Sequence, residues 1–148
     1  MRPSTLHIML ADDDEDDRLF FKEAFEEVKV DHTITTFNDG VQLMNYLLKP
    51  ENAIPDIIFL DLNMPRKSGV ECLKEIRGDQ RLKEITVAIY STSSSEQDIE
   101  DTFVAGANVY IRKPNDFSML KKVLSDVVQI NWQYITDGFN KDSFILSL

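Results

Sequence analysis

The stretch IIFLDLNMPRKSG, residues 57–69, decides the fold that the sequence predicts. Its four leading apolar residues are typical of a buried strand that ends at Asp61, and Asn63, Pro65 and Gly69 then favour a loop. A carboxylate at the C-terminal end of a buried strand lies where open α/β sheets bind their ligands. Asp61 is therefore the first candidate for a functional residue.

Polar side chains follow three other apolar runs in the same way. The run 6–11 ends in Asp12-Asp13-Asp14, the run 86–90 in Ser91-Thr92, and the run 109–111 in Arg112-Lys113-Pro114. In a parallel sheet the carboxyl ends of the strands lie at one edge, where ligands bind. We therefore expect an acid pair, a lone acid, a hydroxyl and a lysine to gather at that edge.

The whole chain alternates short apolar runs with stretches of helical period. This alternation predicts an α/β fold with a doubly wound parallel sheet and helices on both faces. Strands 6–11, 56–60 and 86–90 are almost continuously apolar and should be central, whereas 32–37 alternates and should lie near an edge. The fifth strand is expected at 109–112, and the helices at about 15–28, 40–48, 68–77, 95–104 and 116–134. Ser93 and Glu96 have the spacing of a capping box for the fourth helix.

Composition excludes several classes of protein. A formal charge of −10 argues against nucleic-acid binding, which needs a basic surface. No apolar run approaches the ~18 residues of a membrane span, and the N-terminus does not resemble a signal peptide. The single cysteine, Cys72, allows no intrachain disulfide and fits a helical core position. We therefore expect a cytoplasmic protein that acts in a reducing compartment.

The converging acids indicate a metal site. Three carboxylates brought close together repel one another and raise each other's pKa, and a divalent cation removes this conflict. A small number of oxygen ligands suits Mg²⁺, or Mn²⁺ in its place, better than zinc. Zinc would need histidine or cysteine ligands, and His7, His32 and Cys72 lack the spacing of a ligand set.

Lys113 and Ser91 add the remaining groups for one reaction. A lysine, a hydroxyl and a bound metal ion around a carboxylate form a pocket for a tetrahedral oxyanion, as phosphoryl transfer requires. The carboxylate among them, Asp61, would then be the nucleophile, and the product an aspartyl phosphate.

On these residues the chain resembles the receiver domain of two-component response regulators. The matching motifs occur in order as Leu10 to Asp14, Leu60 to Pro65 with Ser68-Gly69, Ser91-Thr92, Ala105-Gly106-Ala107, and Tyr110 to Pro114. Together they cover about residues 6–134. The resemblance implies a five-stranded, flavodoxin-like sheet with strand order 2-1-3-4-5. The charged loop 78–84 is similar to that of single-domain regulators associated with phytochrome-type and other hybrid kinases.

The resemblance also implies roles for individual residues. Asp61 would be the phosphoacceptor, Ser91 the switch hydroxyl, Tyr110 the switch aromatic, and Lys113 the lysine of the site, with a cis bond to Pro114. Asp12, Asp13, Asp61 and the backbone carbonyl of Asn63 would bind the metal, with Asp13 the more direct ligand of the acid pair. Such a protein is not an enzyme with a separate substrate, because it catalyses only its own phosphorylation and dephosphorylation. Its partners would be a sensor histidine kinase or histidine phosphotransfer protein and an output protein not identified by sequence.

Two other functions compete with this interpretation. A haloacid-dehalogenase-type phosphatase also places a nucleophilic aspartate after a strand, but it needs a second acid where this chain has Asn63. A pseudo-receiver would keep the fold as a binding module without phosphorylation, although every expected acceptor group is present here.

The C-terminal segment is a separate expectation. We divide the chain into a receiver domain, residues 1–134, and an apolar tail, residues 135–148. Such a tail is too rich in large apolar groups for a disordered segment, so it should dock. Ile130, Trp132 and Tyr134 lie off the main apolar stripe of the last helix. They would be covered either by the tail of the same chain or by a second copy in a homodimer.

Overall fold

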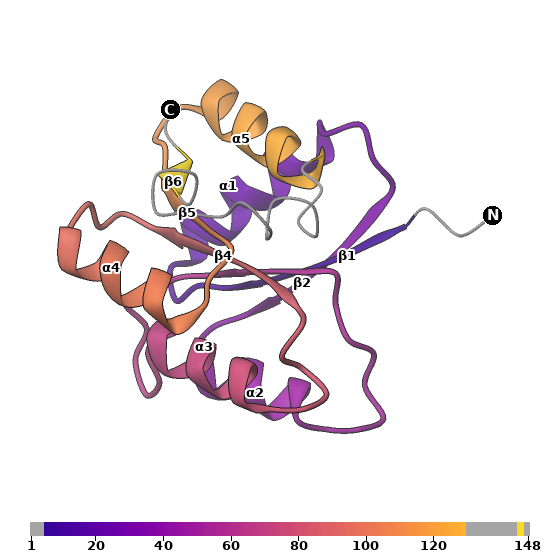
Figure 1. Cartoon of the computed structure of the whole chain (residues 1–148). Helices are drawn as coiled ribbons and strands as arrows, with labels where there is room; N and C mark the ends of the chain where they lie inside the picture. The colour runs from indigo at the N-terminus through magenta and orange to yellow at the C-terminus, as the bar shows by residue number, and fades with distance from the viewer. Residues whose placement is uncertain (1–4, 130–144, 147–148) are drawn as a thin grey trace.

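The computed structural model describes residues 5–129 and 145–146 and shows a parallel sheet covered by helices on both faces (Figure 1). The strands are β1 (Leu6–Ala11), β2 (His32–Phe37), β3 (Ile57–Leu60), β4 (Thr86–Ser91), β5 (Val109–Arg112) and β6 (Ile145–Leu146). The helices are α1 (Glu15–Glu26), α2 (Gly40–Leu47), α3 (Gly69–Gly78), α4 (Glu96–Ala105) and α5 (Phe117–Gln129). The expected order 2-1-3-4-5 is confirmed, and β6 adds a two-residue strand beside β5.

The strands are ordered as their composition predicts. β1, β3 and β4 are central and buried, and β2, which alternates polar and apolar residues, lies at an edge. Ala11 pairs with Leu60, and Leu60 with Ile89, so neighbouring strands end almost level. The amide of Asp61 donates to the carbonyl of Ala11 at 3.0 Å. This register places the first residues after β1 and β3 next to each other.

Alternation along β3 divides the core into two layers. Ile57 and Phe59 face α1 and α5, where Phe21 packs edge-on against the Phe59 ring at a centroid distance of 4.9 Å. Ile58 and Leu60 face the other side, which α2, α3 and α4 cover (Figure 1). Cys72 belongs to this second layer and is fully buried. Two buried layers hold the strand ends rigidly, which is what a site built on them needs.

Short polar side chains set the starts of the helices. Ser68 accepts from the amide of Glu71, whose carboxylate accepts from the amide of Ser68, so α3 begins with a complete capping box. The capping box expected from Ser93 and Glu96 is wrong. Ser95 caps α4 by accepting from the amide of Asp98. The Ser93 hydroxyl instead donates to the Asp98 carboxylate at 2.6 Å, because the loop places it beside the first turn of α4.

Arg81 attaches the long charged loop between α3 and β4 to the end of α2. The guanidinium of Arg81 donates to the carbonyls of Leu47, Lys49 and Asn52. The carbonyl of Leu47 lies at the C-terminus of α2, where intrahelical donors run out. The loop therefore has a structural role in closing the end of α2.

The C-terminal end of the described chain extends the sheet. Ile145 pairs with Tyr110 and Leu146 with Ile111, both in parallel register with β5. The structure does not describe Ile130, Trp132 and Tyr134 of the predicted last helix, or residues 135–144 and 147–148 of the tail. Within the part of the chain that the structure describes, no helix combines the length and apolar character needed to span a bilayer.

Candidate functional site

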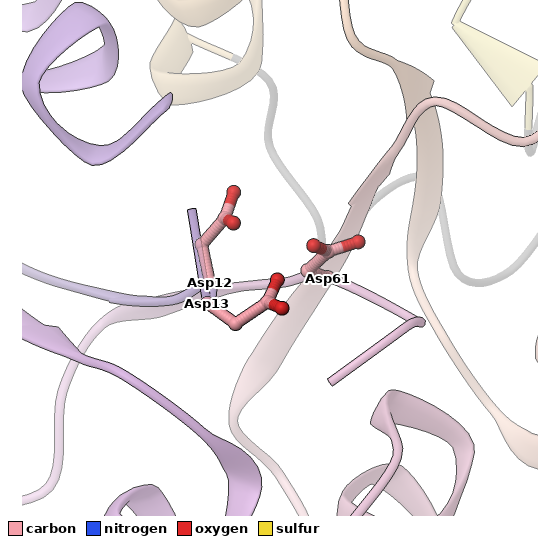
Figure 2. A group of neighbouring side chains, drawn as sticks. All are labelled: Asp12, Asp13 and Asp61. Carbon is pink, nitrogen blue, oxygen red and sulfur yellow. The ribbon is translucent and has the colours of Figure 1, made fainter. Parts of the chain in front are cut away.

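Three carboxylates meet at the C-terminal edge of the sheet. Asp12 and Asp13 follow β1 and Asp61 follows β3, and each places a ligand atom within 4.8 Å of the other two (Figure 2). Asp12 is fully buried and Asp61 is 6 % exposed, whereas Asp13 is exposed. The level strand ends produce this cluster, as the sequence predicts.

Burial changes the acidity of Asp61. Loss of hydration is the main reason why the pKa of its carboxyl is raised from 3.8 to about 6, and the neighbouring Asp12 carboxylate acts in the same direction. The Lys113 ammonium acts in the opposite direction but does not cancel the effect of burial. The site therefore holds its negative charge at an energetic cost that a bound cation would relieve.

Asp12 provides the observation that tests whether a cation fits. One oxygen, Oδ1, accepts from the amide of Asp14 at 2.9 Å. The other, Oδ2, is buried and accepts no hydrogen bond of suitable geometry among the described residues. Its contact with the Lys113 ammonium at 2.8 Å meets only the distance expected of an ion pair. A buried acceptor with spare capacity beside two further carboxylates suits a hard divalent cation such as Mg²⁺ or Mn²⁺.

Lys113 joins this cluster from the loop after β5. Its ammonium lies 3.4 Å from Asp61 Oδ2 and 2.8 Å from both Asp12 Oδ2 and Asp17 Oδ2. Burial alone would lower the lysine pKa, but the nearby Asp12 and Asp17 carboxylates outweigh burial and raise it above the usual range. Lys113 is therefore a permanent cation in the site.

Two contacts of Lys113 are absent from the sequence-based prediction. Asp17 lies in the first turn of α1 and Tyr90 in the buried strand β4, and neither is among the predicted site residues. The ammonium lies 5.3 Å from the centroid of the Tyr90 ring, within the range of a cation–π interaction. An acid one helical turn beyond the acid pair was a usable signal for Asp17, because the start of α1 lies at the same edge as Asp12.

Ser91 and Tyr110 are both fully buried beside this cluster. Ser91 Oγ accepts from the amide of Ser93 at 3.1 Å, and the Tyr110 hydroxyl donates to the carbonyl of Ser93 at 2.9 Å. Ser93 in turn bonds Asp98 of α4. The predicted hydroxyl and aromatic are therefore connected through one residue to the first turn of α4.

Two further predictions concern loop backbone. Asn63 lies two residues beyond Asp61 in the loop that leads to α3, and it is exposed. The cis bond expected between Lys113 and Pro114 is wrong, because the described chain contains no cis peptide. An X–Pro bond prefers trans by only ~0.5–1 kcal/mol, so the surrounding loop decides the isomer and sequence does not.

An open hollow lies at the same end of the sheet. It has a volume of about 350 Å³, and its lining includes Thr92, Lys113, Pro114 and Met119. Lys113 therefore forms part of the wall of an open hollow beside the ends of β4 and β5.

The arrangement has a defined chemical capacity. It combines a buried carboxylate, an acid pair suited to a cation and a fixed ammonium, which are the groups that a carboxylate nucleophile would need to neutralise a tetrahedral anion.

Comparison with known proteins assigns the chain to a family. The model of the response regulator receiver domain matches residues 8–125. Response regulator Rcp1 of Synechocystis is 32 % identical over 124 residues, covering 81 % of this chain and 84 % of its own. The probable methanogenesis regulatory protein FilR2 of Methanothrix harundinacea is 29 % identical, covering 81 % of this chain and 79 % of its own.

Solved structures give the same result. The Mn²⁺-bound form of Rcp1 superimposes with a TM-score of 0.75 at 29 % identity. The phosphorylated cyanobacterial phytochrome response regulator RcpA does so with 0.77 at 35 %. Each comparison covers 84 % of this chain and 91 % of the other.

Proposed function

This chain belongs to the response regulator receiver domain family, and we propose that Asp61 accepts a phosphoryl group from a histidine kinase or a histidine phosphotransfer protein. The observation that carries the proposal is the position of Asp61, which lies beside the acids Asp12 and Asp13 and 3.4 Å from the ammonium of Lys113. The same constellation favours a phosphorylated regulator over a pseudo-receiver. Family membership argues against the haloacid-dehalogenase-type phosphatase.

The reaction proposed is one transfer. A carboxylate oxygen of Asp61 attacks the phosphorus of the donor and forms an O–P bond. The P–N bond of phosphohistidine, or the P–O bond of acetyl phosphate, breaks, and the leaving group takes the electron pair. Lys113 neutralises charge on the phosphoryl oxygens, and Ser91 offers a hydroxyl donor. Mg²⁺, or Mn²⁺ in its place, bound by Asp12, Asp13, Asp61 and the Asn63 carbonyl would neutralise charge on donor and acceptor.

The protein then signals by contact with other proteins, and it turns over no separate substrate. Signalling by contact is supported by the hydrogen bonds that connect Ser91 through Ser93 to Tyr110 and α4. A phosphoryl group on Asp61 would shift the conformation of this connected set of residues. One comparison structure is a phytochrome response regulator, so a phytochrome-type histidine kinase is the first donor to test. A cytoplasmic location agrees with a buried, unpaired Cys72.

Acetyl phosphate and Mg²⁺ provide the direct test. Intact mass spectrometry should show one added phosphoryl group on the wild-type chain and none on Asp61→Asn. Asp31→Asn, which neutralises an exposed carboxylate away from the cluster, is the matched control and should be labelled normally. Labelling of Asp61→Asn at the wild-type rate would exclude Asp61 as the acceptor. Turnover of p-nitrophenyl phosphate would instead favour a phosphatase.

A further inference from the structure

Lys113 is shared among three carboxylates that belong to different parts of the chain. An ammonium has three N–H donors, and here oxygens of three carboxylates lie within 3.4 Å of it. The contacts to Asp12 and Asp17 are 2.8 Å long, and the contact to Asp61 is 3.4 Å. Because the attraction between opposite charges weakens with distance, Lys113 is held mainly by Asp12 and Asp17, the two acids that do not accept the phosphoryl group.

Asp17 differs from the other two partners of Lys113. Asp12 and Asp61 belong to the carboxylate cluster that suits a cation, whereas Asp17 lies outside it, in the first turn of α1. A cation bound by Asp12 and Asp61 would share their charge, but it would leave the charge of Asp17 free to bind Lys113. Asp17 is therefore the acid that continues to compete for the lysine when the site is loaded.

The surroundings of Asp17 keep the free-energy cost of releasing Lys113 low. Its side chain is 37 % exposed, so its carboxylate can exchange the ammonium for water. Its backbone amide is already fixed by the Asp14 side chain that caps α1, at 3.1 Å. The helix therefore does not depend on the ion pair, and the carboxylate can change partner without unfolding the turn.

On this geometry we propose that Asp17 is a positioning residue that restrains Lys113 in the resting protein and competes with the phosphoryl group on Asp61 for it. The inference rests on the proposed function, because it concerns the phosphorylation of Asp61. Phosphorylation requires Lys113 to exchange Asp17 for phosphoryl oxygens. Asp17 thus limits both the rate of the transfer and the stability of the product state.

The test compares two variants with the same loss of charge. Asp17→Asn keeps the size of the side chain and removes its charge. Asp16→Asn makes the same change one residue earlier, at an exposed position that does not contact Lys113. With acetyl phosphate and saturating Mg²⁺, the initial labelling rate of Asp61 should rise about three- to tenfold in Asp17→Asn, the range set by one partly exposed charge-assisted hydrogen bond. Asp16→Asn should stay within about twofold of wild type, as expected of a screened surface charge.

A double-mutant cycle separates competition for Lys113 from a structural effect of Asp17. In a Lys113→Met background the Asp17→Asn change should give no further gain, because the two residues act through one contact. If Lys113→Met is labelled too slowly, the affinity for beryllofluoride, measured by calorimetry, replaces the rate in the same cycle. Asp17→Glu keeps the charge and should return the rate toward wild type.

The outcomes distinguish this inference from the function on which it rests. If wild type is not labelled, or Asp61→Asn is labelled equally, the proposed function fails, whatever Asp17→Asn does. If wild type is labelled on Asp61 but Asp17→Asn is unchanged, slower, or matched by Asp16→Asn, the role of Asp17 is overturned and the function stands. An equal gain from Asp17→Asn with and without Lys113 would also overturn it.

Discussion

The α-carbon of Gly69 faces the backbone of Asp61. A Cβ at position 69 would collide with the carbonyl oxygen of Asp61 and lie 2.9 Å from Leu62 Cα. The Gly69 amide donates to the Leu62 carbonyl at 3.0 Å, so α3 begins directly against the loop that follows Asp61. The start of this helix and the position of Asp61 therefore depend on a missing side chain.

Gly69→Ala should destabilise the protein and misplace Asp61. Overpacking against backbone costs about 1–3 kcal/mol, because neither atom can turn away. Urea unfolding measures the stability, and acetyl phosphate labelling measures the reactivity of Asp61. Gly78→Ala is the matched control, since its Cβ meets nothing within 4 Å and alanine favours the helix. Equal stability of the two variants would contradict the close approach.

The stability of the metal-free protein should depend on the pKa of Asp61. Folding raises that pKa from 3.8 to about 6, chiefly by burial, so the native state binds the proton more tightly than the unfolded chain. This contribution is fully present below about pH 4 and is lost as the pH rises through about 6. It amounts to at most about 3 kcal/mol.

Asp61→Asn should therefore be about 1–3 kcal/mol more stable than wild type at pH 8 in the presence of a chelator. Denaturant unfolding at a series of pH values measures both the gain and the loss of the pH dependence. The exposed Asp31→Asn serves as the control and should keep the wild-type profile. If Asp61→Asn is less stable than wild type at pH 8, the ionised carboxylate of Asp61 does not destabilise the folded protein.

Divalent cations should stabilise the protein through Asp13. Asp13 is exposed, so Asp13→Asn removes a proposed ligand without disturbing the core. A ligand at one hundred times its Kd adds about 2.7 kcal/mol of stability to the protein that binds it. Thermal unfolding with and without Mg²⁺ should show this gain in wild type and little of it in Asp13→Asn. The gain should shrink below about pH 6, where a proton on Asp61 competes with the cation. Equal gains in both proteins would exclude Asp13 as a ligand.

Tyr110→Phe should loosen the connection between the site and α4. It removes the hydroxyl that donates to the Ser93 carbonyl, at a cost of about 0.5–1.5 kcal/mol. Hydrogen exchange should be faster at residues 92–98 and unchanged in β1 and β3. Tyr46→Phe, on the opposite end of the sheet in α2, is a control for loss of a phenol. Unchanged exchange at residues 92–98 would remove Tyr110 from the proposed connection.

The carboxylate cluster was predictable because it depends on topology alone. Alternating strands and helices require a parallel sheet, and a parallel sheet brings the residues after β1 and β3 to one edge. Asp12, Asp13 and Asp61 meet there as expected. Lys113 follows by the same reasoning, since it comes directly after β5.

The contacts that were not predicted depend on directions of side chains and on local loop geometry. Asp17 reaches Lys113 only because of how α1 leaves β1, which periodicity does not describe. Ser95 rather than Ser93 caps α4, because several adjacent serines all satisfy the capping pattern. The β6 pairing involves two residues, too few for any period to indicate a strand.

The separations along the chain between Lys113 and its partners have a consequence for biosynthesis. Lys113 is 52 residues from Asp61 and 96 from Asp17, so its contacts are among the most non-local in the protein. Contacts of this kind close late, because long loops must be ordered before they form. A nascent chain that has left the ribosome only as far as α4 contains all three carboxylates but not the lysine that balances them. The contact between Lys113 and Asp61 thus forms only in the completed fold, and a partly made chain would lack the ammonium that the proposed phosphoryl transfer needs.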